Sequence, residues 1–279
     1  MKKQLTKVIA KFYGQLLNFL ALFNPEKAAV KGFDIFCTVR KGKILSNQKL
    51  YLDPFKHKVH LVADHKIQTY TWQGEKETVL LVHGWESNTW RWHKLIEKLT
   101  EANFNIIAFD APAHGYSSGN HLYVPLYAEA LDFMLKTYRP NHVIGHSVGG
   151  MTILYNEYRN PNSDIEKIVT IGSPSEFHEI MSHYQNLLGF NNKVLTALDD
   201  YIKKRFDFTI REFSTSHYAK TNTKKGLLFH DKLDPITPYH ASEQVHSNWN
   251  ASEFISTEGL GHSMHQVEVN EKIVAFLSS

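Results

Sequence analysis

A serine between glycines lies near the middle of the chain, in the sequence Gly-His-Ser-Val-Gly-Gly of residues 145–150. An apolar run ends at Ile144 directly before this sequence, and a helical pattern begins directly after it. Glycines on both sides of Ser147 allow a strand to turn sharply into a helix, which leaves the serine hydroxyl exposed in a strained turn. A serine held in this way can attack a carbonyl carbon, whereas the alternative interpretation is a tight turn with an inert serine.

A serine nucleophile needs a general base, and the base needs an acid that orients it. Two later segments supply these residue types, each directly after a further apolar run. The first segment contains Asp231 and Asp234, and the second contains His262 and His265. Because the carboxyl ends of parallel strands meet at one edge of a sheet, we expect an acid and a histidine from these segments to converge on Ser147.

The residues that carry this chemistry lie at the ends of short apolar runs that alternate with helical patterns. This alternation is typical of an α/β protein with a mostly parallel sheet and helices on both faces. Continuous apolar runs predict strands buried on both sides, and alternating runs predict half-exposed antiparallel strands. We expect buried strands at residues 78–82, 105–109, 142–144, 167–171, 226–230 and 253–255, antiparallel strands at 58–63 and 67–72, and helices at 90–102, 124–138, 150–159 and 270–277.

The interval from residue 175 to residue 222 is too long for a plain crossover between two strands. It is polar and aromatic, with helical patterns at residues 177–188 and 194–206. We predict that it is a lid over the mouth of the sheet, with an extended surface excursion as the alternative. Phe177 and Met181 are expected to contact the substrate, unless they form the lid's own core. The predicted domains are an N-terminal helical extension at 1–54, a core at 55–174 and 223–279, and a lid at 175–222.

Four motifs in order resemble the α/β-hydrolase superfamily, and the resemblance extends from about residue 55 to the end of the chain. The sequence Leu-Val-His-Gly-Trp at residues 81–85 looks like the loop that supplies one oxyanion amide. Residues 109–117 look like the family's Asp-x-Pro-Gly-x-Gly-x-Ser loop, with Ala113 where glycine is usual. The turn at Ser147 and the two late segments follow in the family's order. Residues 20–45 add a weaker resemblance to a group of bacterial α/β hydrolases without settled substrates.

The resemblance implies a fold with a mostly parallel sheet and an inserted helical lid, and it implies roles for the site residues. Ser147 would be the nucleophile, His262 its base and Asp234 the orienting acid, because the family's acid stands in an Asp-x-x-x-Pro setting and its histidine follows a glycine. Asp231 and His265 remain the rival acid and base. The backbone amides of Trp85 and Val148 would form the oxyanion hole, and His83 and His146 would shape the substrate pocket.

The resemblance implies hydrolysis of a small-molecule carboxylic ester through an acyl-enzyme, without a metal or other cofactor. Thioesterase, C–C bond hydrolase, acyltransferase and cofactor-free peroxidase activities use the same three residues and remain alternatives. A ligand receptor or interaction protein on the same scaffold is a further alternative, because fold alone does not decide function. Haloalkane dehalogenase activity is disfavoured, because its nucleophile is an aspartate where this chain has Ser147.

The composition of the 279 residues is that of an ordinary globular protein, with a net charge of +3. Because the basic residues are scattered, we expect no nucleic-acid partner. One cysteine, Cys37, excludes an internal disulfide, and no metal-ligand motif is present. We therefore expect a protein of a reducing compartment, the cytoplasm, with a protein indifferent to redox state as the alternative. The sequence does not predict an oligomeric state.

An apolar stripe at helical spacing lies near the N-terminus and consists of Ile9, Phe12, Leu16, Leu20 and Phe23. The apolar stretch superficially resembles a signal peptide, but Lys11 interrupts it and no small-x-small cleavage site follows. It is too short to span a bilayer. We expect the stripe to pack on the protein's own surface, and a helix lying on a membrane surface is the less favoured alternative.

Overall fold

The computed structural model describes residues 2–279, with side chains described from residue 8 onward. Its centre is a mostly parallel sheet with the strand order β1-β2-β4-β3-β5-β6-β7-β8. The β1 and β2 strands and the β2 and β4 strands pair antiparallel, and all other neighbours pair parallel. The strands are β1 (Lys56–Val62), β2 (His65–Trp72), β3 (Thr78–Val82), β4 (Asn105–Phe109), β5 (His142–His146), β6 (Lys167–Ile171), β7 (Lys225–Asp231) and β8 (Ser252–Thr257).

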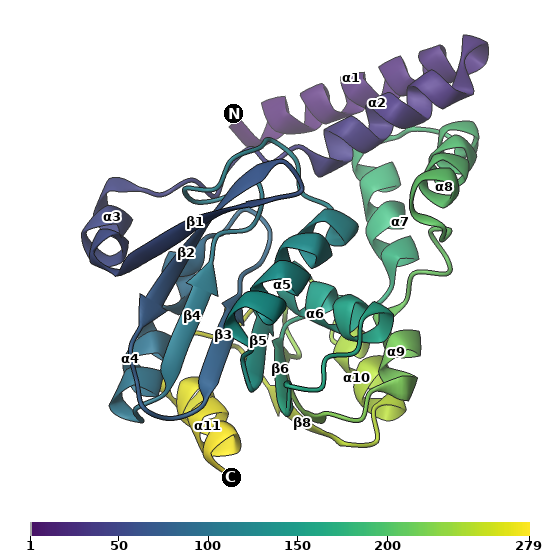
Figure 1. Cartoon of the computed structure of the whole chain (residues 1–279). Helices are drawn as coiled ribbons and strands as arrows, with labels where there is room; N and C mark the ends of the chain where they lie inside the picture. Colours follow the sequence, from purple (N-terminus) through teal and green to yellow (C-terminus); the bar gives the residue numbers. More distant parts are fainter. Residues whose placement is uncertain (1) are drawn as a thin grey trace. The chain divides into compact units, whose positions relative to one another are not determined.

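Helices cover both faces of this sheet, as predicted (Figure 1). Side chains alternate across a strand, so Val79 and Leu81 of β3 point to one face, while Leu80 and Val82 point to the other. The first face packs against α4 (His93–Glu101) and α11 (Val267–Ser278). The second face packs against α5 (Val124–Tyr138), α6 (Val148–Arg159) and α10 (His240–Asn248).

All eight expected strands are present, and those at residues 78–82, 105–109 and 167–171 have the predicted ends. The expected helix at 90–102 is a 3₁₀ turn, Thr89–Trp92, followed by α4. The sequence patterns did not predict α10, nor the short elements α3 (Ser46–Leu52), Asp53–Phe55, α9 (Thr215–Tyr218) and Ala219–Thr221. These segments are short or polar, so their apolar periodicity is too weak to distinguish a helix from a loop.

The chain forms two compact units, which divide it differently from the three expected segments. Residues 39–175 and 215–279 form one unit, which contains the sheet. Residues 1–38 and 176–214 form the other, the helical unit, which contains α1 (Lys2–Phe23), α2 (Pro25–Cys37), α7 (Phe177–Leu188) and α8 (Asn192–Phe206). The N-terminal helices and the inserted helices thus share one core. The lid role of residues 175–222 stays a prediction.

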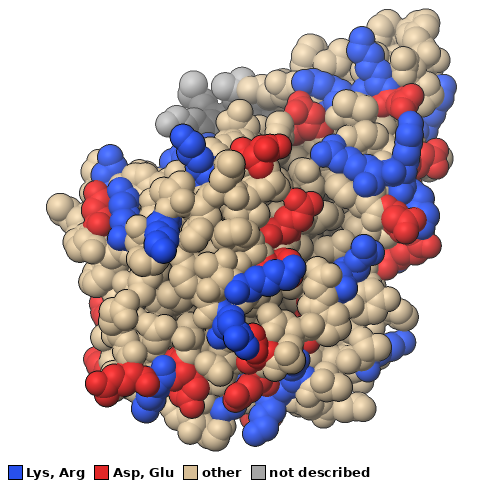
Figure 2. Space-filling view, viewed as in Figure 1, with Lys and Arg blue, Asp and Glu red and all other residues tan. Residues whose placement is uncertain are grey.

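The expectation that the N-terminal stripe packs on the protein's own surface is wrong. Ile9, Phe12, Leu16 and Phe23 are exposed, because α1 packs through its opposite side. Among residues 2–279, no helix is long and apolar enough to cross a bilayer. Lys and Arg side chains alternate with Asp and Glu over the face of the molecule drawn in Figure 2.

Candidate active site

Ser147 lies in a strained turn between β5 and α6. Its backbone has φ 53° and ψ −125°, a conformation that a residue with a side chain rarely adopts. The amide of Ser147 donates a 2.8 Å hydrogen bond to the carbonyl of Ile171 at the end of β6, which holds the turn in place. A Cβ atom at Gly149 would overlap with the carbonyl of Val82, so only glycine allows α6 to start this close to β3.

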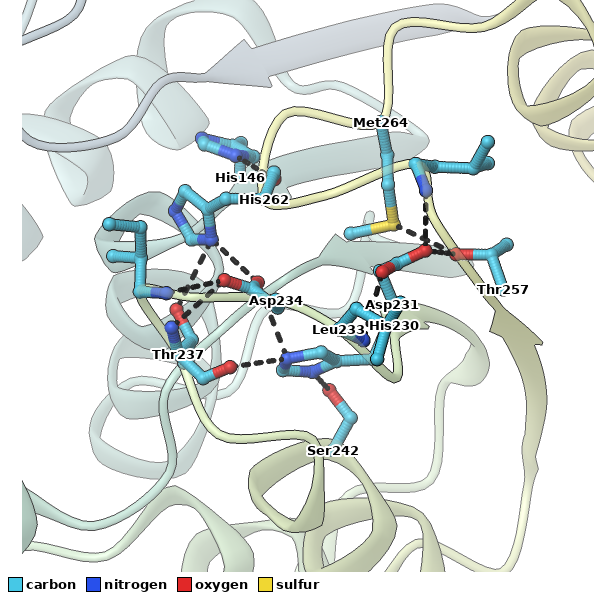
Figure 3. Close-up of polar contacts among 12 residues, drawn as sticks. His146, His230, Asp231, Leu233, Asp234, Thr237, Ser242, Thr257, His262 and Met264 are labelled. Carbon is cyan, nitrogen blue, oxygen red and sulfur yellow. Dashed lines mark hydrogen bonds and ion pairs between the residues drawn. The ribbon is translucent and has the colours of Figure 1, made fainter.

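His262 and Asp234 form a close pair at the carboxyl ends of β7 and β8 (Figure 3). The distance from His262 Nδ1 to Asp234 Oδ2 is 2.7 Å, and the Asp234 side chain is completely buried. Asp234 Oδ1 accepts hydrogen bonds from the backbone amides of Ile236, at 2.8 Å, and Thr237, at 3.0 Å. The structure therefore brings together the acid and the histidine that the sequence favoured.

His230 supports Asp234 from the side opposite His262 (Figure 3). Its Nε2 lies 3.5 Å from Asp234 Oδ2 and 3.0 Å from the Thr237 carbonyl, and both of these atoms are acceptors. His230 Nε2 therefore carries the proton, and its Nδ1 accepts from the Ser242 hydroxyl at 2.7 Å. The sequence patterns did not assign this role, although His230 stands four residues before Asp234 at the end of β7.

Burial raises the pKa of Asp234, but its hydrogen-bond donors outweigh burial and hold the pKa well below its usual range. These donors are His230, His262 and the amides of Thr237 and Ile236. The carboxylate thus stays ionised and accepts a hydrogen bond from His262 Nδ1, which carries the ring proton. The lone pair of His262 is then on Nε2, which is the atom that a general base in this arrangement uses.

Asp231 has a structural role that differs from that of Asp234. Its carboxylate accepts hydrogen bonds from the Thr257 hydroxyl and from the amides of Leu233, Gly259 and Leu260. These contacts tie the end of β7 to the loop that follows β8. The rival base, His265, has a pKa that burial lowers to about 4, and no hydrogen bond joins its ring to an acid among residues 2–279.

His146 connects the turn at Ser147 to the His262 loop. Its Nε2 lies 2.9 Å from the carbonyl of His262, and the two imidazole rings are 4.7 Å apart between centroids. Burial lowers the pKa of His146 well below the usual value, so the ring is neutral and donates from Nε2. Within residues 2–279, the Ser147 hydroxyl itself makes no hydrogen bond to His262, and catalytic contacts often tighten only when substrate is bound.

Two buried histidines cross-link the loop that contains Trp85 to the loop that follows β4. His83 Nε2 accepts a 2.9 Å hydrogen bond from the amide of Ala111, and its Nδ1 donates to the Gly84 carbonyl. In return, His114 Nε2 accepts a 2.9 Å bond from the amide of Glu86. Burial lowers the pKa of His83 to about 4 and that of His114 to about 3, so both rings stay neutral acceptors.

This cross-link positions the amide of Trp85, one of the two expected oxyanion donors. A Cβ atom at Gly84 would lie 3.0 Å from the Cβ of Ser147, so the loop passes close to the serine. The second donor, the amide of Val148, is the first of α6, where helix amides have no partner within the helix. Neither amide donates a hydrogen bond to another backbone group in the described part of the chain. Both are therefore available to an oxyanion.

The neutral buried histidines predict that stability falls as the solution becomes acidic. A histidine whose pKa is lower in the folded state than its unfolded value, about 6.5, stabilises the protein fully above that value and loses this contribution as pH falls. At about 1.4 kcal/mol per pH unit between the two pKa values, His83 accounts for about 3 kcal/mol between pH 6.5 and pH 4. We therefore expect the melting temperature to decrease from about pH 6.5 downward, measured by calorimetry.

His114→Gln is the matched variant for this measurement, because glutamine retains an acceptor for the Glu86 amide but does not titrate. Its melting temperature should depend less steeply on pH than that of the unmodified protein. A melting temperature that stays constant down to about pH 4.5 would contradict the assignment of neutral buried histidines.

Arg91 is a further residue near the site, and the sequence patterns did not identify it. Its Nη2 donates a 2.9 Å hydrogen bond to the carbonyl of Ser263, directly after His262. The guanidinium lies 4.3 Å from the centre of the Trp92 ring, and burial lowers its pKa to about 9. No motif identified it, and it lies within the helix expected at residues 90–102, where no sequence pattern indicated a contact with the His262 loop.

The predicted substrate contacts stay predictions. Both ring nitrogens of His83 bond to the backbone, and one nitrogen of His146 bonds to the His262 carbonyl, so both rings have positioning roles. Phe177 and Met181 belong to the helical unit. Met181 is buried there, and the Phe177 ring packs against Phe213, with 5.9 Å between centroids.

Two family models match successive ranges of the chain. A family model described as "alpha/beta hydrolase fold" matches residues 77–204, and a second, "TAP-like protein", matches residues 209–279. Similar solved structures include an esterase from Exiguobacterium antarcticum, with a TM-score of 0.63, 17% identity and coverage of 80% of this chain and 99% of that chain. Est1E from Butyrivibrio proteoclasticus, solved with ferulic acid bound, has a TM-score of 0.65 and 16% identity, and the match covers 80% of this chain and 98% of that chain.

The curated relatives include pimeloyl-[acyl-carrier protein] methyl ester esterases of Vibrio species. The protein from Vibrio vulnificus strain YJ016 is 27% identical over 143 residues, which are 50% of this chain and 52% of the relative. The protein from Vibrio campbellii is 28% identical over 145 residues, 51% of this chain and 54% of the relative. The chain thus spans about half the length of the curated relatives it matches. With the solved structures, these matches confirm the fold that the motifs predicted.

Proposed function

Because the chain belongs to the α/β-hydrolase superfamily, we propose that it is a serine hydrolase that cleaves a carboxylic ester. The observation that carries this proposal is the 2.7 Å pair between His262 and an ionised, completely buried Asp234. A buried carboxylate with this set of donors orients an imidazole so that its other nitrogen is free to accept a proton.

The proposed reaction has two acyl-transfer steps. Ser147 Oγ attacks the carbonyl carbon of the ester while its proton passes to His262 Nε2. The amides of Trp85 and Val148 hold the oxyanion, and the intermediate expels the alcohol, which takes the proton from Nε2. Water then attacks the acyl-enzyme with the same base, and the carboxylic acid leaves as Ser147 recovers its proton.

The curated relatives favour an ester bond over the other bonds that this set of residues can cleave. Those relatives are methyl ester esterases, although they match over half of their length. The solved structures of this fold include a meta-cleavage product hydrolase and a bromoperoxidase, so fold alone does not select the reaction. We therefore assign the chain an ester substrate and leave its acyl group to experiment.

A panel of p-nitrophenyl esters with graded acyl length tests this proposal. We expect a burst of p-nitrophenol close to the enzyme concentration, followed by steady turnover, because the acyl-enzyme forms before it hydrolyses. The dependence of kcat/KM on acyl length would define the substrate class. A folded protein that turns over no ester in the panel, but binds the esters or their acids, would support a receptor and overturn the proposal.

A further inference from the structure

The α1 helix packs in the helical unit through one narrow face. Gly14, Leu17 and Ala21 are buried, and they recur at the spacing of one helix face. A Cβ atom at Gly14 would overlap with the carbonyl of Leu188, so α1 approaches the end of α7 at backbone distance. Lys11 Nζ donates to the Asn186 carbonyl at 2.8 Å, which fixes α1 along the same helix.

The opposite face of α1 is apolar and exposed over the length of the helix for which side chains are described. Phe12, Phe19 and Phe23 are 67%, 62% and 76% exposed, and the Phe19 and Phe23 rings contact each other at 5.3 Å between centroids. The further exposed apolar side chains of the helix are Val8, Ile9, Leu16 and Leu22. A soluble helix normally turns its apolar stripe inward, so this continuous outward stripe indicates a surface that contacts another apolar phase.

The charged residues of α1 are all lysines and lie in its first half. The helix contains Lys2, Lys3, Lys7 and Lys11 but no Asp or Glu, and residues 12–25 contain no charged side chain. The helical unit as a whole has 11 Lys and Arg against 8 Asp and Glu, whereas the rest of the chain has 20 of each. The whole net charge of +3 therefore belongs to this unit.

We propose that the exposed face of α1 docks the protein onto an anionic lipid bilayer. The phenylalanines and leucines of this face would enter the boundary between headgroups and acyl chains, with the helix lying in the plane of the surface. The net positive charge of the helical unit would be attracted to anionic headgroups, which favour basic proteins near a membrane. A second copy of the chain fits less well, because α1 of a partner would bring more lysines and no acid to pair with them.

Vesicle co-sedimentation of the full chain tests this proposal. We expect the protein to sediment with vesicles of phosphatidylcholine and phosphatidylglycerol, and less with phosphatidylcholine alone, because the net positive charge of the helical unit favours the anionic surface. The triple variant Phe12→Gln, Phe19→Gln and Phe23→Gln should lower the partition coefficient onto the anionic vesicles by about tenfold or more, because it removes most of the aromatic surface. These side chains are exposed, so the melting temperature should change little.

A control variant also replaces three exposed apolar residues by glutamine, but outside α1, in Leu50→Gln, Val59→Gln and Leu61→Gln. This variant should partition like the unmodified protein. Wild-type protein that stays in the supernatant with both vesicle types overturns the proposal, as does a triple variant that binds as well as the control. A dimer in analytical ultracentrifugation that the triple variant dissociates, without vesicle binding, would assign the face to a second copy instead. Equal binding to both vesicle types would overturn the choice of an anionic surface.

Discussion

Replacing Ser147 by alanine is expected to lower kcat/KM for a p-nitrophenyl ester by about 10³-fold or more. The hydroxyl is the atom that would form the acyl-enzyme, and alanine leaves only the oxyanion donors and the binding of substrate to act on the reaction. Alanine meets the same strain as serine at φ 53°, so the fold should not change. The burst of p-nitrophenol should disappear together with turnover.

Ser247→Ala is the matched control for this substitution. Ser247 lies on α10, and its hydroxyl donates to the Glu243 carbonyl on the same helix. The control makes the same chemical change on the same sheet-containing unit and should retain the rate of the unmodified protein. An unchanged rate in Ser147→Ala would exclude Ser147 as the nucleophile.

Replacing Asp234 by asparagine is expected to lower kcat by about 10⁴-fold, the size of the loss when the orienting acid of a serine protease becomes its amide. The reason lies in the hydrogen bonds of the carboxylate. Asp234 Oδ1 accepts hydrogen bonds from the backbone amides of Ile236 and Thr237. An asparagine must therefore place its oxygen at the position of Oδ1 and its NH₂ group toward His262. His262 Nδ1 would then accept a hydrogen bond from this NH₂ group, and the single ring proton would lie on Nε2, so the base could not accept the proton of the serine.

Asp231→Asn distinguishes the two acids, because the structure gives Asp231 only structural partners. An amide at this position sets an NH₂ group against backbone N–H donors, so we expect the melting temperature to fall by several degrees. The kcat of the folded variant should fall far less than that of Asp234→Asn. A larger loss of kcat in Asp231→Asn, measured where both variants are folded, would reverse the assignment of the acid.

Much of the core could be predicted because its strands are continuous apolar runs between polar or turn-forming residues. The run at residues 78–82 became β3 with the expected ends, and the run at 105–109 became β4. The α10 helix was missed, because its sequence His-Ala-Ser-Glu-Gln-Val-His-Ser-Asn has too few apolar positions to show a period. A polar sequence of this kind gives no periodic apolar signal, and the helix is stabilised by its packing against the sheet.

The N-terminal helix shows that an apolar stripe does not by itself predict which face of a helix is buried. The stripe from Ile9 to Phe23 was visible in the sequence, and a stripe is usually the buried side of a helix. The buried face of α1 is instead the one that contains Gly14, where α1 meets the backbone of α7. A contact between residues 174 positions apart, Gly14 and Leu188, leaves no local signal in either segment.

The sequence by itself determined the order of the parts: an apolar strand before the serine, two later acids, two later histidines, and the apolar runs that build the sheet between them. Local propensity and apolar periodicity act over a few residues, and these features are local. Only the tertiary structure decided that Asp234, and not Asp231, meets His262, and that His83 and His114 bind each other's loops. Such choices depend on which strand ends lie side by side and on which donors the folded backbone presents, and both arise only when distant segments pack together.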